Sequence, residues 1–383
     1  MKYSTKVVHI SKPDETTGAL STPIYQTSSY QQISPDNPKN GFAYTRTGNP
    51  TRKAAEEAVA TLEGGRFGFA FASGLAATDC VLKLLSAGDE VVSVDDVYGG
   101  TYRILTTVYN RLGVKSTFVD SSDASNVEKA LTDKTRIVWL ETPTNPTLKI
   151  SDIESIAKIA HAKGAILVVD NTFLSPALQR PLELGADIVL HSATKYLSGH
   201  GDVLAGFLIL NDEKIAEQLK YLQNTSGGVL APQDSWLTIR GIRTLALRMD
   251  KHSENAEKIA QFLVNHPLVD KVYFPGLPQH KNHDIAKKQQ KSFGGMISFS
   301  LKNDTIETAA KFLTSTQIFY LAESLGDVFS LVSHPATMTH KSTPPEVRRA
   351  TGIQDSLIRL SVGIEDAEDL ISDIEQALEK TKA

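Results

Sequence analysis

The stretch AILVVDNTFLSPALQRPLELGADIVLHSATK (165–195) contains two apolar runs, AILVVD and ADIVLH, with a helix-length segment between them. Both runs are short and rich in β-branched residues, which predicts strands buried on both faces. Further runs of this kind are DEVVSV, STFVD, RIVWLE and GFLIL. Because helical patterns such as SNVEKAL and DIESIAKIAHAKG separate them, we predict an α/β fold with a mainly parallel sheet and flanking helices. In such sheets ligands bind at the carboxyl ends of the strands.

Three regions of different pattern divide the chain. Residues 1–50 carry five prolines among polar residues, which predicts an extended N-terminal arm. Residues 51–245 contain the alternating strands and helices. Residues 246–383 begin with the helical DKHSENAEKIAQFLVNHP and continue with GGMISFSL, TIETAAKFL and EDAEDLISDIEQALEK. We therefore predict a ligand-binding domain over 51–245 and a smaller α+β C-terminal domain over 246–383.

Composition narrows the class of protein. With 383 residues, 41% of them hydrophobic and 22% charged, the chain has the composition of a globular protein. A net charge of −4 offers no basic field for nucleic acid or an anionic membrane. The single cysteine, Cys80, cannot form an internal disulfide, and no histidine spacing suggests a metal centre. Without a signal-peptide core or an apolar membrane-length run, we expect a cytoplasmic protein with no metal, nucleic-acid or membrane partner.

Two charged residues stand where strands are predicted to end. Asp170 closes AILVVD, and Lys195 follows ADIVLH after three small residues. Taken alone, such residues are more often a turn cap and a solvated charge, because charged side chains are rarely fully buried. A buried carboxylate and a buried amine are otherwise unfavourable unless they are paired, hydrogen-bonded or neutral.

A phosphate-binding pattern changes the interpretation of this pair. Ser73, Gly74 and Leu75 in FASGLAATDCVLKLLSAG stand at the start of a predicted helix, whose first amide groups can bind an anion. Ser192 and Thr194 flank Lys195 with hydroxyl groups. A phosphate site, an amine and a carboxylate at one sheet edge fit pyridoxal phosphate, whose aldehyde reacts with lysine and whose ring nitrogen pairs with a carboxylate.

Eight motifs in order along the chain resemble the Cys/Met metabolism family of pyridoxal-phosphate enzymes, which contains cystathionine γ-synthase, cystathionine γ- and β-lyases and methionine γ-lyase. The motifs are YTRTGNPT (44–51), FASGLAA (71–77), DDVYGGTYR (95–103), ETPTNP (141–146), VVDNTF (168–173), HSATKYLSGH (191–200), AESLGD (322–327) and IRLSVGIED (358–366). The resemblance implies a fold-type I enzyme that forms a homo-oligomer, usually a dimer of dimers, with active sites shared between subunits.

The resemblance also implies roles around the cofactor. Lys195 would form the Schiff base and move protons, Asp170 would pair with the ring nitrogen, and Tyr98 would stack on the ring and share in catalysis. Tyr98 could otherwise be a core aromatic residue beside a Gly-Gly turn. The implied phosphate contacts are Ser73, Gly74, Leu75, Ser192 and Thr194, with Tyr44 and Arg46 supplied by the neighbouring subunit.

Five residues are implied at the substrate. Arg359 would bind the α-carboxylate, a task suited to a bidentate guanidinium, with Asn145 and Ser324 beside it. Arg103 would lie near the substrate's distal end, although it could equally be a helix-surface arginine. Phe329 stands where many relatives have a glutamate, which implies a shifted or broadened specificity.

Within the family the chain is most similar to the cystathionine γ-lyases. The implied reaction is α,γ-elimination of cystathionine to cysteine, 2-oxobutyrate and ammonia, with release of hydrogen sulfide from cysteine or homocysteine as a possible side activity. The alternative is γ-replacement, as in cystathionine γ-synthase or an O-acylhomoserine sulfhydrylase. Gly100 stands where methionine γ-lyases carry a cysteine, which disfavours that activity. A non-catalytic module remains an alternative of another class, whereas a dehydrogenase would need a glycine fingerprint that the sequence lacks.

Overall fold

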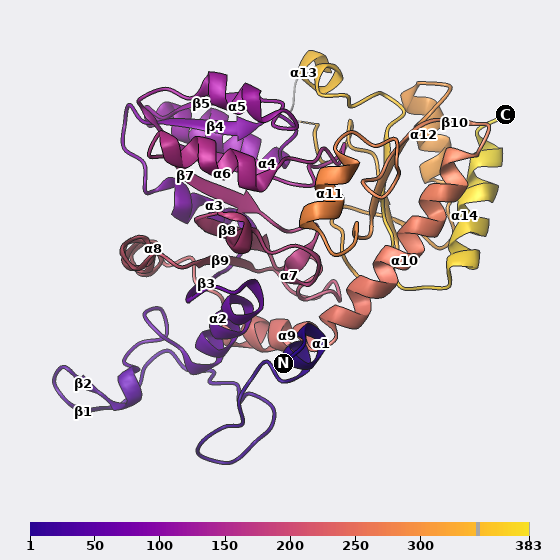
Figure 1. The fold of residues 1–383 in the computed structure, drawn as a ribbon. Coiled ribbons are helices and arrows are strands. Elements are labelled where there is room, and N and C mark those ends of the chain that lie inside the picture. The colour runs from indigo at the N-terminus through magenta and orange to yellow at the C-terminus, as the bar shows by residue number, and fades with distance from the viewer. Residues whose placement is uncertain (342–344, 383) are drawn as a thin grey trace.

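A seven-stranded sheet forms the centre of the larger part of the molecule in this computed structural model, which describes residues 1–341 and 345–382 (Figure 1). Its order is β3-β9-β8-β7-β6-β4-β5, in which β8, β7, β6, β4 and β5 run parallel and β9 is antiparallel to both neighbours. The strands are β3 (Phe67–Phe71), β4 (Glu90–Val94), β5 (Lys115–Val119), β6 (Thr135–Glu141), β7 (Ile166–Asp170), β8 (Ile188–Ser192) and β9 (Gly206–Leu210). The predicted mainly parallel sheet is confirmed, and the six predicted runs coincide with β4 to β9, whereas β3 was not predicted.

Helices cover both faces of this sheet and bury an apolar core on each side. One face carries α2 (Pro50–Glu63), α5 (Ala124–Ala130), α6 (Ile153–Ala162), α7 (Ser175–Leu178), α9 (Pro232–Ile242) and a 3-10 turn, η3 (Pro181–Leu184). The other carries α3 (Gly74–Leu82), α4 (Gly99–Arg103), the π-helical η2 (Ile104–Tyr109) and α8 (Glu213–Ser226). α6 illustrates why the predicted bounds hold: the Asp152 side chain accepts from Ser155 N at its start, and Gly164 adopts φ +70° just past its end.

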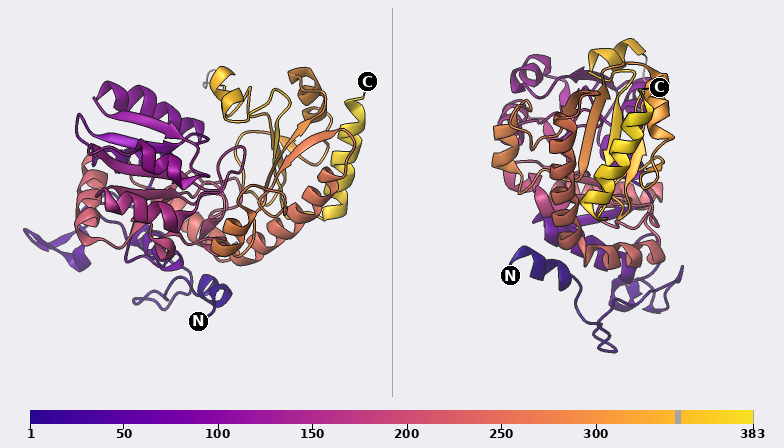
Figure 2. Two further views of the ribbon diagram at one scale, coloured as in Figure 1. Left: turned by 45° about the horizontal axis from the view of Figure 1, so that its top comes forward. Right: turned by 90° about the vertical axis from the view of Figure 1, so that its right-hand side faces the viewer.

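A second sheet of five strands forms the C-terminal part, with the order β10-β11-β14-β13-β12. Its strands are β10 (Val269–Tyr273), β11 (Met296–Leu301), β12 (Tyr320–Leu321), β13 (Leu331–Ser333) and β14 (Ile358–Ser361), and its helices are α10 (Leu245–Val264), α11 (His283–Gln289), α12 (Ile306–Leu313), α13 (Pro345–Ala350) and α14 (Ala367–Lys380). The long helix α10 spans both parts (Figure 2). Its first turns, with Leu245 and Met249, pack in the first core, whereas Ile259 and Leu263 pack in the second. The domain division at residue 245 stays a prediction.

The N-terminal region is extended except for its first residues. The chain between α1 (Tyr3–Val8) and α2 projects from the body and contains the small hairpin of β1 (Gln32–Ser34) and β2 (Asn37–Pro38), followed by η1 (Lys39–Gly41) (Figures 1 and 2). The sequence did not predict α1, which packs on the body because Tyr3 and Val7 lie on one helical face and Val7 is fully buried. Across residues 1–341 and 345–382, the helices lack the length and hydrophobicity that crossing a membrane requires.

Candidate active site

A cavity of about 470 Å³ opens where β6, β7 and β8 end, and β14 of the second sheet contributes to its wall. This is the sheet edge at which a ligand is expected. The cavity brings together eleven of the residues predicted from the sequence: Ser73, Gly74, Leu75, Tyr98, Asn145, Asp170, Ser192, Thr194, Lys195, Ser324 and Arg359.

Lys195 lies in the turn after β8 with its side chain inside the cavity. Its Nζ donates to Ser324 Oγ at 3.0 Å. Burial lowers the pKa of this amine to about 8, and the positive charge of Arg359 acts in the same direction. A substantial fraction of Lys195 is therefore neutral near pH 8, the form in which an amine is a nucleophile or a base.

Asp170, the last residue of β7, is a buried carboxylate in the same cavity. Burial raises its pKa, while hydrogen bonds to Oδ1 from Thr172 N (3.0 Å) and Thr172 Oγ1 (2.5 Å) oppose that rise. Thr172 Oγ1 also accepts from Ser192 N at 2.9 Å, so it ties the end of β7 to the end of β8.

The start of α3 forms a cup at one side of the cavity. Ser73 caps the helix, because its Oγ accepts from Ala76 N at 3.0 Å. A Cβ on Gly74 would lie 3.0 Å from Ser192 Cβ, so glycine allows the helix to start directly against β8. The Thr194 hydroxyl bonds to the backbone of Ala205 beside this cup. Backbone amides and hydroxyl groups are thus gathered where an anion can bind.

Arg359 on β14 presents a guanidinium that is only partly paired. Its Nη1 donates to Asn145 Oδ1 at 2.8 Å and its Nη2 to Ser324 O at 2.9 Å, whereas Nε is buried without a partner among the described residues. Burial lowers the pKa of Arg359 to about 10. Ser324 has φ +93°, which is strained for a serine and places its hydroxyl and carbonyl toward Lys195 and Arg359. A buried, incompletely paired guanidinium fits a carboxylate ligand.

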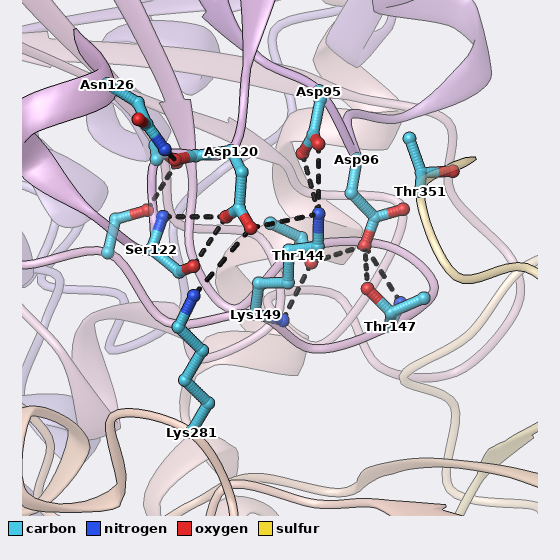
Figure 3. A network of polar contacts seen from close by, with 12 residues as sticks. Asp95, Asp96, Asp120, Ser122, Asn126, Thr144, Thr147, Lys149, Lys281 and Thr351 are labelled. Carbon is cyan, nitrogen blue, oxygen red and sulfur yellow. Dashed lines mark hydrogen bonds and ion pairs between the residues drawn. The ribbon is translucent and has the colours of Figure 1, made fainter. Parts of the chain in front are cut away.

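A buried aspartate fixes the turn that carries Asn145 (Figure 3). Asp96 Oδ2 accepts from Thr144 Oγ1 (2.6 Å), Thr147 N (3.0 Å) and Thr147 Oγ1 (2.5 Å). Beside it, Lys149 Nζ donates to Asp95 at 2.9 Å. These bonds hold both sides of the turn and so keep Asn145 within reach of the guanidinium on the other sheet.

Tyr98 stands at the N-terminus of α4 with its ring partly exposed in the cavity. Its N–H donates to Glu141 Oε2 at 2.8 Å. A Cβ on Gly100 would lie 2.5 Å from the Tyr98 ring, so the Gly-Gly turn is needed for the ring to fold back over α4. Burial raises the pKa of the Tyr98 hydroxyl, which keeps that group protonated.

The structure places four predicted residues outside the lining of this cavity. Tyr44 lies exposed on the N-terminal arm with the Arg46 guanidinium 5.3 Å from its ring centroid. Arg103 is exposed at the end of α4. Phe329 packs edge-on against Tyr320, with 5.7 Å between the ring centroids.

Comparisons with known proteins agree with this geometry. Residues 4–379 match the model of the family described as Cys/Met metabolism PLP-dependent enzyme. The chain is 54% identical to a cystathionine gamma-lyase of Bacillus subtilis (strain 168), over 99% of this chain and 100% of that protein. It is also 54% identical to a cystathionine beta-lyase of Lactococcus lactis subsp. cremoris (strain MG1363), over 98% of each chain. The crystal structure of cystathionine gamma-lyase from Lactobacillus plantarum complexed with L-serine superposes with a TM-score of 0.97 at 48% identity, covering 100% of both chains.

The chain belongs to the Cys/Met metabolism family of pyridoxal-phosphate-dependent enzymes. Its fold is the fold-type I arrangement of that family. The cavity also fits the cofactor by its chemistry, since it combines the amine of Lys195, the carboxylate of Asp170 and the anion cup at Ser73.

Several residues of this family member's cavity were not singled out from the sequence. They are Glu141, Thr172, Glu323 and Thr339, with Thr101 on α4. Glu141 and Glu323 belong to motifs that were recognised, ETPTNP and AESLGD, so the signal was present. An acid for the substrate's distal end was instead sought at position 329, whereas the structure has the exposed carboxylate Glu323 directly before Ser324.

Proposed function

We propose that this enzyme catalyses the α,γ-elimination of L-cystathionine, which with water gives cysteine, 2-oxobutyrate and ammonia. The observation that supports the proposal is that two groups of opposite charge, a guanidinium and a carboxylate, line the same cavity. The buried guanidinium of Arg359 fits an α-carboxylate, and the exposed carboxylate of Glu323 fits a distal ammonium group. Ser324 lies between them in sequence and contacts both Arg359 and Lys195. Cystathionine carries an amino-acid group at each end and matches this pairing.

Each side chain of the site has a separate role in the elimination. When bound, pyridoxal phosphate supplies an aldehyde that reacts with amines and a ring that withdraws electrons from the carbon next to it. Asp170 favours the protonated ring nitrogen, and the α3 cup at Ser73 holds the phosphate. Lys195, whose pKa of about 8 allows both protonation states, removes the Cα and Cβ protons. The protonated Tyr98 hydroxyl or the Lys195 ammonium returns a proton to the departing sulfur.

A second candidate is β-elimination of the same substrate, which gives homocysteine, pyruvate and ammonia. It is favoured by the 54% identity to a relative named cystathionine beta-lyase, equal to that of the relative named gamma-lyase. The two reactions share the substrate, the cofactor and the carboxylate site, and they differ in which carbon–sulfur bond breaks. The γ-replacement reaction of an acylhomoserine with cysteine or sulfide also shares these groups.

Product analysis separates the reactions. The holoenzyme is incubated with L-cystathionine, and 2-oxobutyrate and pyruvate are separated and quantified by chromatography. Parallel incubations contain cysteine, homocysteine, or O-acetyl- and O-succinylhomoserine with cysteine. We expect 2-oxobutyrate from cystathionine to dominate. Pyruvate in excess, or faster formation of cystathionine from an acylhomoserine, would contradict the proposal. Lys195→Ala, which should lose both the products and the visible absorbance of the lysine-bound cofactor, is the control.

We further propose that the active site is completed by a second copy of the chain, in a dimer of dimers. Tyr44 and Arg46 lie on an arm that projects from the body, outside the cavity of their own subunit. The family resemblance assigns such residues to the phosphate of the neighbouring subunit. An exposed tyrosine with an arginine over its ring is suited to bind that phosphate from outside.

A further inference from the structure

Two carboxylates stand side by side at the floor of the cavity. Glu141 ends β6 and Asp170 ends β7, and the parallel register places them opposite each other. Both side chains are buried and both line the cavity. Neither makes an ion pair with a lysine, arginine or histidine in the part of the chain that the structure describes. Two adjacent buried carboxylates without such partners are strongly disfavoured when both are ionised.

The surroundings of Glu141 favour its protonated form. Burial raises its pKa well above the usual value, and the charge of Asp170 raises it further. Asp96 also raises it, whereas Arg359 and the hydrogen bond from Tyr98 N oppose the rise. Asp170 belongs to β7, Asp96 follows β4, Arg359 belongs to β14 and Tyr98 directly precedes α4. These groups therefore act on Glu141 from four different elements.

Burial raises the pKa of Asp170 as well, but its surroundings oppose that rise more strongly than those of Glu141. Two hydrogen bonds from Thr172 reach Oδ1. The positive charges of Lys195 and of His191, when it is protonated, act in the same direction. Hydrogen bonds to a carboxylate stabilise its ionised state, so Asp170 loses its proton more readily than Glu141.

We propose that Glu141 is a positioning residue that holds the Tyr98 backbone as a neutral acid and leaves the single negative charge of the pair on Asp170. Its carbonyl-type oxygen, Oε2, accepts the Tyr98 N–H and so fixes the start of α4. Its proton prevents repulsion with Asp170, which needs its charge if it pairs with the cofactor ring. The inference therefore rests on the role proposed for Asp170, but its first test requires neither cofactor nor substrate.

The first test compares Glu141→Gln and Glu141→Ala with the wild-type full-length chain, purified free of cofactor. A group whose folded-state pKa is raised contributes stability below its unfolded-state pKa, near 4.5, and that contribution is lost as pH rises through the folded-state value. The variants lack this proton. We expect their thermal midpoint relative to wild type to rise by a few degrees between pH 5 and pH 8. Because both variants remove the same titrating group, the trend does not depend on one of them.

The matched control is Glu254→Gln on α10. Glu254 is exposed, and its hydrogen bond with Lys258 lowers its pKa, so its charge is constant over this range. Its thermal midpoint relative to wild type should not rise from pH 5 to pH 8. A Glu141→Gln curve parallel to the wild-type curve would overturn the proposal.

The second test uses the cofactor-loaded variants. Glutamine retains a carbonyl oxygen for Tyr98 N–H, so Glu141→Gln should keep kcat for cystathionine within about threefold, whereas Glu141→Ala should lower kcat by roughly tenfold or more. Equal losses in both variants would show that Glu141 acts through a negative charge or by transferring its proton, against the proposal. A wild-type enzyme that makes no 2-oxobutyrate would contradict the proposed function and would leave the pH test valid.

Discussion

Arg359 presents in the cavity the guanidinium that we propose as the binding group for the substrate carboxylate. Its planar guanidinium bonds Asn145 and Ser324 through different nitrogens and keeps Nε free for a ligand. A lysine is a single point charge and cannot keep these contacts together. We expect Arg359→Lys to raise KM for cystathionine by roughly 10- to 100-fold, with a smaller effect on kcat. Steady-state kinetics measure both constants.

The control for this change is an arginine outside the cavity. Arg136 on β6 is half exposed and pairs with Asp89 at 3.4 Å. Arg136→Lys should leave KM unchanged. A KM for Arg359→Lys equal to that of the control would remove Arg359 from the carboxylate site.

The pKa of Lys195 makes a prediction about loading of the cofactor. Only the neutral amine attacks an aldehyde, and this amine titrates at about 8 in the cofactor-free chain. The rate of covalent incorporation of pyridoxal phosphate should therefore rise about tenfold per pH unit below this value and level off above it. Stopped-flow absorbance follows the reaction. A rate that keeps rising up to pH 10 would mean that burial has not lowered the pKa of Lys195.

At the residue scale, the sequence predicted those residues of the candidate site that stand at or just after the ends of strands. Asp170 and Lys195 were predicted because Asp170 ends one short apolar run and Lys195 follows closely after another, and the ends of parallel strands meet at one edge of a sheet. Glu141 also ends a strand, but its importance comes from lying opposite Asp170, and sequence does not give strand register. Phe329 was expected at the substrate, whereas the fold packs it against Tyr320, because side-chain direction in an irregular segment depends on tertiary contacts.

Among structural elements, the turn after β6 depends on one buried carboxylate. Asp96 Oδ2 accepts three hydrogen bonds from Thr144 and Thr147 (Figure 3). In Asp96→Ala these buried donors lose their acceptor, so we expect a loss of about 2–4 kcal/mol in the free energy of unfolding. Because Asn145 lies in the same turn, KM for the substrate should rise as well. Urea unfolding and steady-state kinetics measure the two effects.

Thr147→Val is the matched variant for this turn. It keeps the side-chain shape and removes one of the three donors, so about 1 kcal/mol should be lost. If Asp96→Ala were no less stable than Thr147→Val, the turn would be held by other contacts. The elements themselves were largely predictable, since capping residues and apolar periodicity mark α6 and the strands of the large sheet. The short helix α1 was not, because its stability comes from docking Val7 on the body.

On the scale of the whole molecule, both sheets contribute residues to the proposed active site. Lys195 and Asp170 come from the seven-stranded sheet and Arg359 from the five-stranded sheet, and α10 spans the two cores. Contacts such as Lys195 Nζ to Ser324 Oγ and Arg359 to Asn145 join the two parts across the cavity. The relative position of the sheets therefore controls the distance between the Lys195 amine and the Arg359 guanidinium.

The proposed sharing of active sites makes a prediction about mixed oligomers. Arg46→Ala removes a side chain outside its own cavity, and Lys195→Ala removes the catalytic amine, so each homo-oligomer should be nearly inactive. In a hybrid dimer one site has both substitutions and the other has neither. Refolding the two variants together in equal amounts should therefore restore about 25% of wild-type activity, because half of the dimers are hybrids with one intact site.

This recovery distinguishes a shared site from a self-contained one. If Arg46 acted within its own subunit, each site of a hybrid would still carry one substitution, and mixing would restore nothing. The negative control is a mixture of Lys195→Ala and Asp170→Asn. Both residues line one cavity of a single chain, so every site of such a hybrid carries one substitution and no activity should return. Activity of the Arg46→Ala and Lys195→Ala mixture no higher than this control would contradict the sharing of Arg46 between subunits.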